Sequence, residues 1–281
     1  MKIIHSVKEM QAWAFALKKK NLSVGFVPTM GALHAGHRSL IRRARSENDE
    51  VVVSVFVNPL QFGPREDYKK YPRTLKNDLQ ALKEEQVGIV FYPSAADMIP
   101  TGFSTWVDAP ALTSTLCGPF RPGHFRGVAT IVAKLFHAVR PDRAYFGEKD
   151  YQQIRVIDRM VKDLAMPVRV VACPTVREPS GLACSSRNRA LSSREREEAV
   201  KLYQALYLGR ELVEQKLMKD SARLAKRLKQ VLTAVPKSRI EYISVVDPVT
   251  LAPMQKIRRP ALLAAAWWIG KTRLIDNVVI S

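Results

Sequence analysis

The first two-thirds of the chain alternates short apolar runs with longer amphipathic stretches, and this alternation constrains the fold more than any other feature. The run Val51–Val57 is β-branched and apolar on both faces, which is typical of a parallel strand buried between two layers of helices. Strand-like runs also occur at 23–28, 89–92, 143–146 and 168–172, and helical patterns at 36–48, 74–86, 126–139 and 150–165, where Asp150 is placed to cap the helix. This order predicts βαβ units, and therefore an α/β fold with a parallel sheet and helices on both faces.

The pattern changes after Pro174. Two long polar helices are expected first, at 193–216 and 220–235, and Ser192 and Glu195 have the spacing of a capping box at the start of the first one. Three strand-like runs follow, at 241–246, 261–269 and 272–280, and turns containing Pro or Gly separate them. We therefore predict a second, smaller α+β domain with a short antiparallel sheet, so that the domains are 1–176 and 177–281.

Composition excludes several classes of protein. Of 281 residues, 47% are apolar and 25% are charged, which is ordinary for a globular domain and excludes a disordered or collagen-like chain. The longest apolar run, 261–269, is too short to span a bilayer, and Glu9 interrupts the N-terminus before any secretory signal could form. Cys117, Cys173 and Cys184 are odd in number and form no C-x-x-C pair. These features predict a reduced, cytoplasmic protein without membrane association.

The formal net charge of +19 indicates anionic partners, which could be phosphorylated small molecules, nucleic acid or an acidic membrane surface. The basic residues are spread along the chain and form no single block. A generally cationic, solvated surface is therefore the favoured interpretation over a specific nucleic-acid site.

The strongest local motif is PTMGALHAGH at 28–37, between the first predicted strand and its helix. His34 and His37 are three residues apart at a helix start, so their imidazoles face the same way. There they can donate to phosphate oxygens, beside exposed backbone N–H groups and the positive end of the helix dipole. Gly31 and Gly36 let a nucleotide approach the backbone. A glycine turn with incidental histidines is the plainer alternative, and a zinc site is weaker still because no nearby carboxylate or Cys completes a ligand set.

The H-x-G-H pattern is typical of nucleotidyl-transferring α/β enzymes, including class I aminoacyl-tRNA synthetases. Further motifs follow it in order: NPLQF at 58–62, YPRT at 71–74, RPGHFRGV at 121–128, FGEKDYQQ at 146–153, PTVRE at 174–178 and GLACSSRN at 181–188. Together they closely resemble the pantothenate synthetase (pantoate–β-alanine ligase) family, over essentially the whole chain.

The resemblance implies a Rossmann-like N-terminal domain that binds both substrates, a small C-terminal domain that closes over them as a lid, and a homodimer. It implies that ATP, with Mg²⁺, adenylates the carboxylate of (R)-pantoate and releases pyrophosphate. The amine of β-alanine then attacks the pantoyl adenylate to give pantothenate and AMP. No protein nucleophile is required, and the sequence identifies no Mg²⁺ ligand.

The resemblance also assigns residues. His37 would be the catalytic acid at the phosphates. Gln61 would contact pantoate and the region where β-alanine enters, and Gln153 would hold pantoate from the other side. Cys184 is interpreted as an apolar filler and no nucleophile. His124 and Arg121 could either reach the substrate pocket or form a turn or subunit contact. The ATP site would comprise Met30, Gly31, Ala32, Leu33, His34, Ala35, Gly36, His37, Gly147, Glu148, Lys149, Asp150, Val176, Cys184, Ser185, Ser186 and Arg187.

Two rival functions differ in class. One is an H-x-G-H nucleotidyltransferase that makes a dinucleotide instead of an amide, against which the motifs around Gln61 and Gln153 argue. The other is a nucleic-acid-binding protein, which the charge of +19 motivates. The sequence has no Cys/His finger, RNP-like aromatic strand or basic helix with heptads, so we predict no specific nucleic-acid partner.

Overall fold

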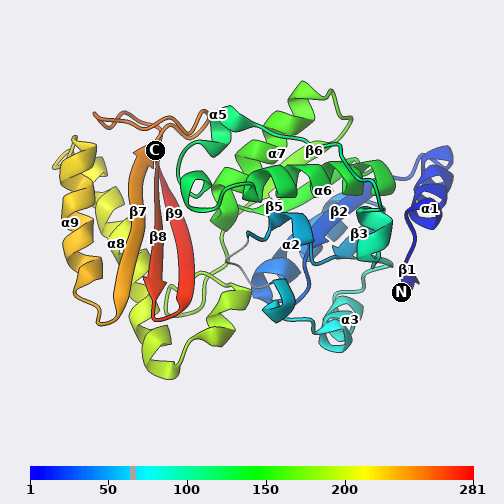
Figure 1. The fold of residues 1–281 in the computed structure, drawn as a ribbon, viewed down its shortest axis with the longest axis horizontal. Coiled ribbons are helices and arrows are strands. Elements are labelled where there is room, and N and C mark those ends of the chain that lie inside the picture. The colour runs from blue at the N-terminus through cyan, green and yellow to red at the C-terminus, as the bar shows by residue number, and fades with distance from the viewer. Residues whose placement is uncertain (64–67) are drawn as a thin grey trace. The chain divides into compact units, whose positions relative to one another are not determined.

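A computed structural model of the chain describes residues 1–63 and 68–281. The chain divides into two compact units. The first comprises Met1–Ala109, Arg121–Glu148 and Gln153–Pro174, and the second comprises Pro110–Phe120, Lys149–Gln152 and Thr175–Ser281. Figure 1 shows the strands β2, β3 and β5 of the first unit beside one another, and the strands β7, β8 and β9 of the second.

The first unit is built on a six-stranded parallel sheet with the order β1-β4-β3-β2-β5-β6, which confirms the predicted α/β class. Its strands are β1 (Lys2–Ile4), β2 (Val24–Thr29), β3 (Glu50–Val55), β4 (Ile89–Phe91), β5 (Arg143–Gly147) and β6 (Arg169–Cys173). Its helices are α1 (Val7–Lys19), α2 (Ala35–Glu47), α3 (Leu75–Glu84), α4 (Ala95–Met98), α6 (His124–Val139) and α7 (Tyr151–Asp163), of which α7 starts in a segment of the second unit.

Helices cover both faces of this sheet. Neighbouring residues of a strand point to opposite faces. Val27 of β2 packs in one apolar cluster with Ile41 of α2, whereas the ring of Phe26 contacts that of Phe136 of α6 edge to face, at 6.3 Å between ring centroids. The two helices therefore lie on opposite sides of β2.

The start of the sheet differs from the sequence prediction. The edge strand β1 was not predicted, because three residues are too few to show a strand pattern, and the helix α1 was not predicted either. β1 pairs with β4 in parallel, and Ser6 caps α1 by accepting a hydrogen bond from the N–H of Glu9. Glu148–Asp150 form a 3₁₀ turn and α7 begins at Tyr151, so Asp150 directly precedes the helix, at the position where the sequence predicts its cap.

The second unit has the antiparallel sheet that the sequence predicts, formed by β7 (Ser238–Val246), β8 (Ala261–Ile269) and β9 (Thr272–Ile280) in that order. The helices α8 (Ser193–Glu214) and α9 (Ser221–Thr233) share one apolar core with this sheet, in which Trp267 is fully buried. Ser192 and Glu195 form the expected capping box at the start of α8.

Two short segments from earlier in the chain also belong to the second unit. The first contains α5 (Pro110–Thr113) and a 3₁₀ turn at Gly118–Phe120. The buried side chain of Gln152 holds it by accepting from the N–H of Cys117 and donating to the carbonyl oxygens of Leu112 and Thr115. The Cys117 thiol and the Tyr242 hydroxyl of β7 lie 3.2 Å apart. Because of these contacts, the segment belongs to the same compact unit as the C-terminal sheet.

Among the residues that the structure describes, no helix is both long enough and apolar enough to cross a membrane.

Candidate active site

The carboxyl ends of β2 and β5 mark the candidate site in the first unit. β3, β4 and β1 lie on one side of β2, and β5 and β6 lie on the other, so the chain changes direction across the sheet between β2 and β5. Open α/β sheets bind ligands outside the carboxyl ends of the strands at such a point. Met30–His37, predicted to bind ATP, directly follow β2, and Gly147 ends β5.

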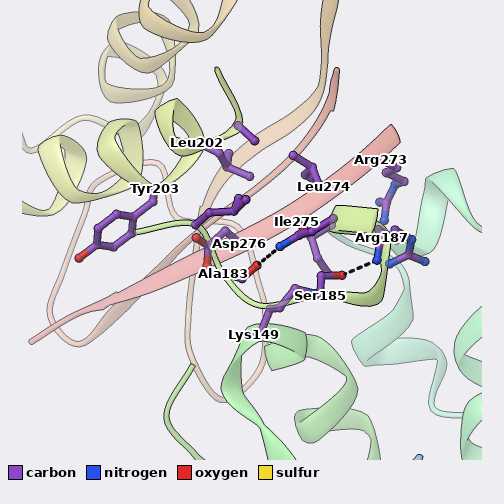
Figure 2. Close-up of a pocket in the computed structure, with 13 residues that line it drawn as sticks. Lys149, Ala183, Ser185, Arg187, Leu202, Tyr203, Arg273, Leu274, Ile275 and Asp276 are labelled. Carbon is purple, nitrogen blue, oxygen red and sulfur yellow. Dashed lines mark hydrogen bonds between the residues drawn. The ribbon is translucent and has the colours of Figure 1, made fainter. Parts of the chain in front are cut away.

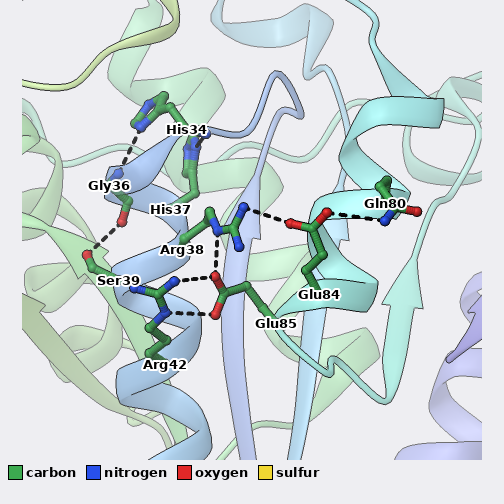
Figure 3. Close-up of polar contacts among 9 residues, drawn as sticks. All are labelled: His34, Gly36, His37, Arg38, Ser39, Arg42, Gln80, Glu84 and Glu85. Atoms are coloured by element: carbon green, nitrogen blue, oxygen red, sulfur yellow. Dashed lines mark hydrogen bonds and ion pairs between the residues drawn. The ribbon is translucent and has the colours of Figure 1, made fainter.

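His34 and His37 meet at the start of α2 (Figure 3), with ring centroids 4.0 Å apart. The Nδ1 atom of His34 accepts a hydrogen bond from the N–H of Gly36 at 3.1 Å. The Nδ1 atom of His37 accepts from the N–H of His34 at 3.4 Å, which completes a capping box. Because both Nδ1 atoms accept from N–H groups, the proton of each neutral imidazole resides on Nε2. Each Nε2 is therefore a hydrogen-bond donor, as contact with a phosphate oxygen requires.

Most of the backbone N–H groups of this loop already donate to side chains, either of the loop and its strand or of Asp78 on α3. The prediction that they would be exposed beside the phosphates was wrong for Gly31, Ala32, Leu33, His34 and Gly36, because each donates to a neighbouring side chain. Nearby polar side chains accept the hydrogen bonds that a phosphate would otherwise accept. Anion contacts from the loop therefore fall to its side chains.

Asp78 of α3 is the acceptor for two of these N–H groups, and the sequence analysis missed it. Its side chain accepts from Ala32 at 3.1 Å and from Leu33 at 2.8 Å, and the Thr74 hydroxyl donates to it at 3.1 Å. Asp78 is only 2% exposed. The sequence signal was present, since Asp78 falls on the same helical face as Leu75 and Leu82 and so places a charge on the apolar side of the helix.

Ion pairs fix α2 against the end of α3. Glu85 follows α3 directly and accepts hydrogen bonds from Arg38 and Arg42, both on α2, as Figure 3 shows. The hydrogen bonds from Arg42, helped by those from Arg38, hold the pKa of the Glu85 carboxyl below its usual value. Since the Glu85 side chain is only 5% exposed, these pairs anchor the helix that carries both histidines.

Gln61 ends a 3₁₀ turn, Pro59–Gln61, that follows β3. Its side-chain oxygen accepts from the Asn58 amide at 2.9 Å, so its NH₂ group is the part available as a donor to a ligand. The Nη1 atom of Arg121 lies 2.9 Å from Nε2 of His124, and Nδ1 of His124 lies 2.9 Å from the backbone oxygen of Gln61. Because Arg can only donate, His124 accepts at Nε2 and donates from Nδ1. In this structure the two residues therefore support the Gln61 turn.

The remaining predicted residues of the first unit are Glu148 and Gln153. Glu148 begins the 3₁₀ turn after β5, and Gln153 is the third residue of α7 and is half-buried. Both follow the carboxyl end of β5 closely.

A small hairpin in the second unit carries the other predicted nucleotide residues. The N–H of Cys184 donates to the carbonyl oxygen of Val176 at 2.9 Å, and Arg177 pairs with Ala183 in an isolated antiparallel bridge. Gly181 turns the hairpin with φ +96°, and a Cβ atom there would lie 2.7 Å from the ring of Tyr203. The hairpin thus brings Val176 and Cys184, two residues predicted to bind the nucleotide, next to each other.

Lys149, Ser185 and Arg187 line one pocket in the second unit (Figure 2). Residues of β9, including Arg273 and Asp276, also line it. The adjacent Asn277 donates its side-chain amide to the backbone oxygen of Lys149 at 3.0 Å. Ser185 caps the 3₁₀ helix Ser186–Ala190 by accepting from the N–H of Arg187. The lining therefore includes positive side chains and a hydroxyl, which suit an anionic group, beside apolar residues such as Leu182 and Leu202.

In the part of the chain that the structure describes, no group of three or more His, Cys, Asp or Glu residues could hold a metal ion. Cys117 and Cys173 are buried, Cys184 is half-buried, and none of them is in a disulfide. Burial raises the pKa of the Cys173 thiol, which disfavours its thiolate.

Comparison with known proteins supports one family throughout. Residues 2–279 match the sequence model of the pantoate-beta-alanine ligase family. Pantothenate synthetase from Thermotoga petrophila is 50% identical over 280 residues, and the match covers 100% of both chains. The enzyme of the same name from Thermosipho africanus is 51% identical over 280 residues and again covers 100% of both chains.

Solved structures agree with this match. The crystal structure of pantothenate synthetase from Thermus thermophilus has a TM-score of 0.93 and 49% identity, and the alignment covers 100% of this chain and 99% of that one. Pantoate-beta-alanine ligase from Francisella tularensis, solved in complex with beta-gamma ATP and beta-alanine, has a TM-score of 0.81 and 39% identity, with coverage of 99% and 97%. The chain therefore belongs to the pantoate–β-alanine ligase family and is an enzyme of that family.

Proposed function

We propose that this enzyme condenses (R)-pantoate with β-alanine at the expense of ATP, through a pantoyl-adenylate intermediate, and releases AMP and pyrophosphate. The observation that carries the proposal is the gathering of Lys149, Ser185 and Arg187 around one pocket. Positive side chains and a hydroxyl suit the phosphates of ATP, on which charge builds up as pyrophosphate leaves.

In the first step, a carboxylate oxygen of pantoate attacks the α-phosphorus of ATP. The bond from that phosphorus to the oxygen bridging to the β-phosphate breaks, and its electron pair leaves with pyrophosphate. Lys149 and Arg187 offset the growing charge, and the Nε2–H of His37 donates to a phosphate oxygen. The internal hydrogen bond of His37 supports this role, because it holds the proton of the neutral ring on Nε2.

Gln61 and Gln153 orient pantoate. Gln61 does so by donating from its NH₂ group, and it also contacts the region where β-alanine enters. An amide suits a substrate with hydroxyl groups and one carboxylate, because the binding needs direction more than a further charge. In the second step the β-alanine amine attacks the acyl carbon of the adenylate and loses a proton, and AMP leaves with the electrons of the acyl–oxygen bond. The adenylate is itself the activated acyl group, so no protein nucleophile takes part.

We also assign a set of residues to ATP binding. Mg²⁺ would arrive with ATP as part of the substrate, because it binds mainly through nucleotide phosphates and needs few protein ligands. The proposed ATP residues are Met30–His37, Gly147–Asp150, Val176 and Cys184–Arg187.

Four further properties belong to the proposal. The protein would act in the cytoplasm, in line with three cysteines outside any disulfide. Residues 177–281 would act as a lid domain, and the enzyme would be a homodimer, which light scattering after gel filtration would test. The basic surface would be solvated and bind no specific nucleic acid, and any such binding would fall steeply with salt.

Product analysis tests the proposed reaction. With ATP, Mg²⁺, pantoate and β-alanine, the enzyme should release AMP, pyrophosphate and pantothenate in equal amounts. Formation of ADP and phosphate would mean that an acyl phosphate forms instead, and the adenylate mechanism would be wrong.

A further inference from the structure

The loop between β2 and α2 is held in a conformation that its own sequence does not favour. Gly31 and Ala32 are both left-handed, with φ of +79° and +51°. Such a φ suits glycine, whereas for a residue with a Cβ atom it is strained and persists only when the surrounding structure enforces it. Ala32 is completely buried, so its N–H also needs a partner within the protein.

Asp78 supplies that enforcement from another helix. Its two carboxylate oxygens take one N–H each, Oδ2 that of Ala32 and Oδ1 that of Leu33. The Thr74 hydroxyl donates to Oδ2 and fixes the carboxylate in turn. Packing is tight, since a Cβ atom added at Gly31 would lie 3.0 Å from Oδ2.

We propose that Asp78 is a positioning residue for the reaction: its buried carboxylate locks the left-handed turn at Ala32 and Leu33, and so sets His34 and His37 at the start of α2 for ATP. The proposal rests on the proposed function for the identity of the nucleotide. Preorganised donors need no rearrangement during the reaction. Loosening the turn therefore lowers kcat/KM for ATP, although Asp78 does not contact ATP.

Asp78→Asn and Asp78→Ala test this assignment, with Asp142→Asn as the matched control. Asp142 accepts the N–H of Val24 at 2.7 Å, so it is also a carboxylate that holds the backbone of β2, but at the opposite end of the strand. Asn at position 78 keeps the size of the side chain, while its NH₂ group cannot accept the second N–H.

Two readouts separate positioning from general stability. Amide hydrogen exchange without substrates should show protection of Ala32 and Leu33 reduced at least about 10-fold in Asp78→Ala, less in Asp78→Asn, and unchanged in Asp142→Asn. In steady-state assays, kcat/KM for ATP should fall at least about 10-fold in Asp78→Ala while the KM for β-alanine stays within about twofold.

If Asp78→Ala does not fold, Asp78→Asn carries both tests. Protection and kcat/KM for ATP that match the control would overturn the proposal, as would losses spread equally over ATP and β-alanine. The exchange readout needs no activity. A wild-type enzyme that makes no pantothenate would therefore refute the proposed function while leaving the anchoring role of Asp78 to be judged by exchange.

Discussion

Arg177 and Asp276 form a two-pronged ion pair, in which the two terminal nitrogens of Arg177 donate to the carboxylate oxygens at 2.6 and 3.0 Å. The pair joins the hairpin that carries Val176 and Cys184 to β9. Arg177 also stacks on Tyr203, 4.0 Å from the ring centroid, and donates to the carbonyl oxygen of Gly181. One guanidinium thus holds both the base and the turn of the hairpin.

Arg177→Ala should lower the free energy of unfolding by about 3 kcal/mol, because it leaves the Asp276 carboxylate, only 3% exposed, without its cation. Urea denaturation measures this change. Arg159→Ala is the control, since it breaks an exposed i,i+4 pair with Asp163 and should cost no more than about 0.5 kcal/mol. Equal effects of the two variants would show that the Arg177 pair does not stabilise the unit.

His37→Asn should slow adenylation by about 100-fold or more while leaving stability and pantoate affinity near wild type. The Asn side chain can still accept the N–H of His34 and preserve the helix cap, but it lacks the Nε2 donor. Single-turnover kinetics at saturating ATP measure the rate, and His137→Ala, an exposed position on α6, is the control. Adenylation at the wild-type rate in His37→Asn would remove His37 from the mechanism and leave the phosphate charge to Lys149 and Arg187.

Gln61→Ala and Gln153→Ala should mainly weaken pantoate binding, by about 5- to 150-fold, because each leaves polar groups of the substrate unpaired. Titration of pantoate against the adenylation rate gives this affinity. Gln80→Ala is a suitable control, since Gln80 is exposed on α3 and its side-chain amide donates to Glu84 on the same helix. A fall in rate with unchanged pantoate affinity would contradict the assigned role.

The stability of the first unit should fall as the pH rises from about 10 to about 12. Burial raises the pKa of Tyr145 to about 12 from a normal value of 10.0, so the unfolded chain ionises this phenol first and is stabilised relative to the folded one. The full loss is about 2–3 kcal/mol, at 1.36 kcal/mol per pKa unit. Urea denaturation midpoints of wild type and Tyr145→Phe should be compared across this pH range. The comparison separates the ionisation of Tyr145 from that of other groups that titrate there. Parallel pH profiles for the two proteins would refute it.

Periodicity was sufficient for the sheets and the long helices, because buried parallel strands such as β3 are almost continuously apolar. It missed β1, which is too short to show a pattern, and the helix α1 that follows it. The motifs from which the ATP site is proposed could be recognised because their residues are close in sequence. The roles of Asp78 and Asp276 were not found, since each acts on a segment distant in the chain, and only tertiary structure shows which backbone or side-chain groups they reach. The same limit explains the wrong expectation of exposed N–H groups in the loop after β2.

Isotope exchange tests the central claim most directly. The enzyme is incubated with ATP, Mg²⁺, pantoate and labelled pyrophosphate, without β-alanine. If pantoate is adenylated first, label enters ATP in a pantoate-dependent manner, and no exchange occurs when pantoate is omitted. Exchange that requires β-alanine, or that proceeds without pantoate, would contradict the pantoyl-adenylate mechanism.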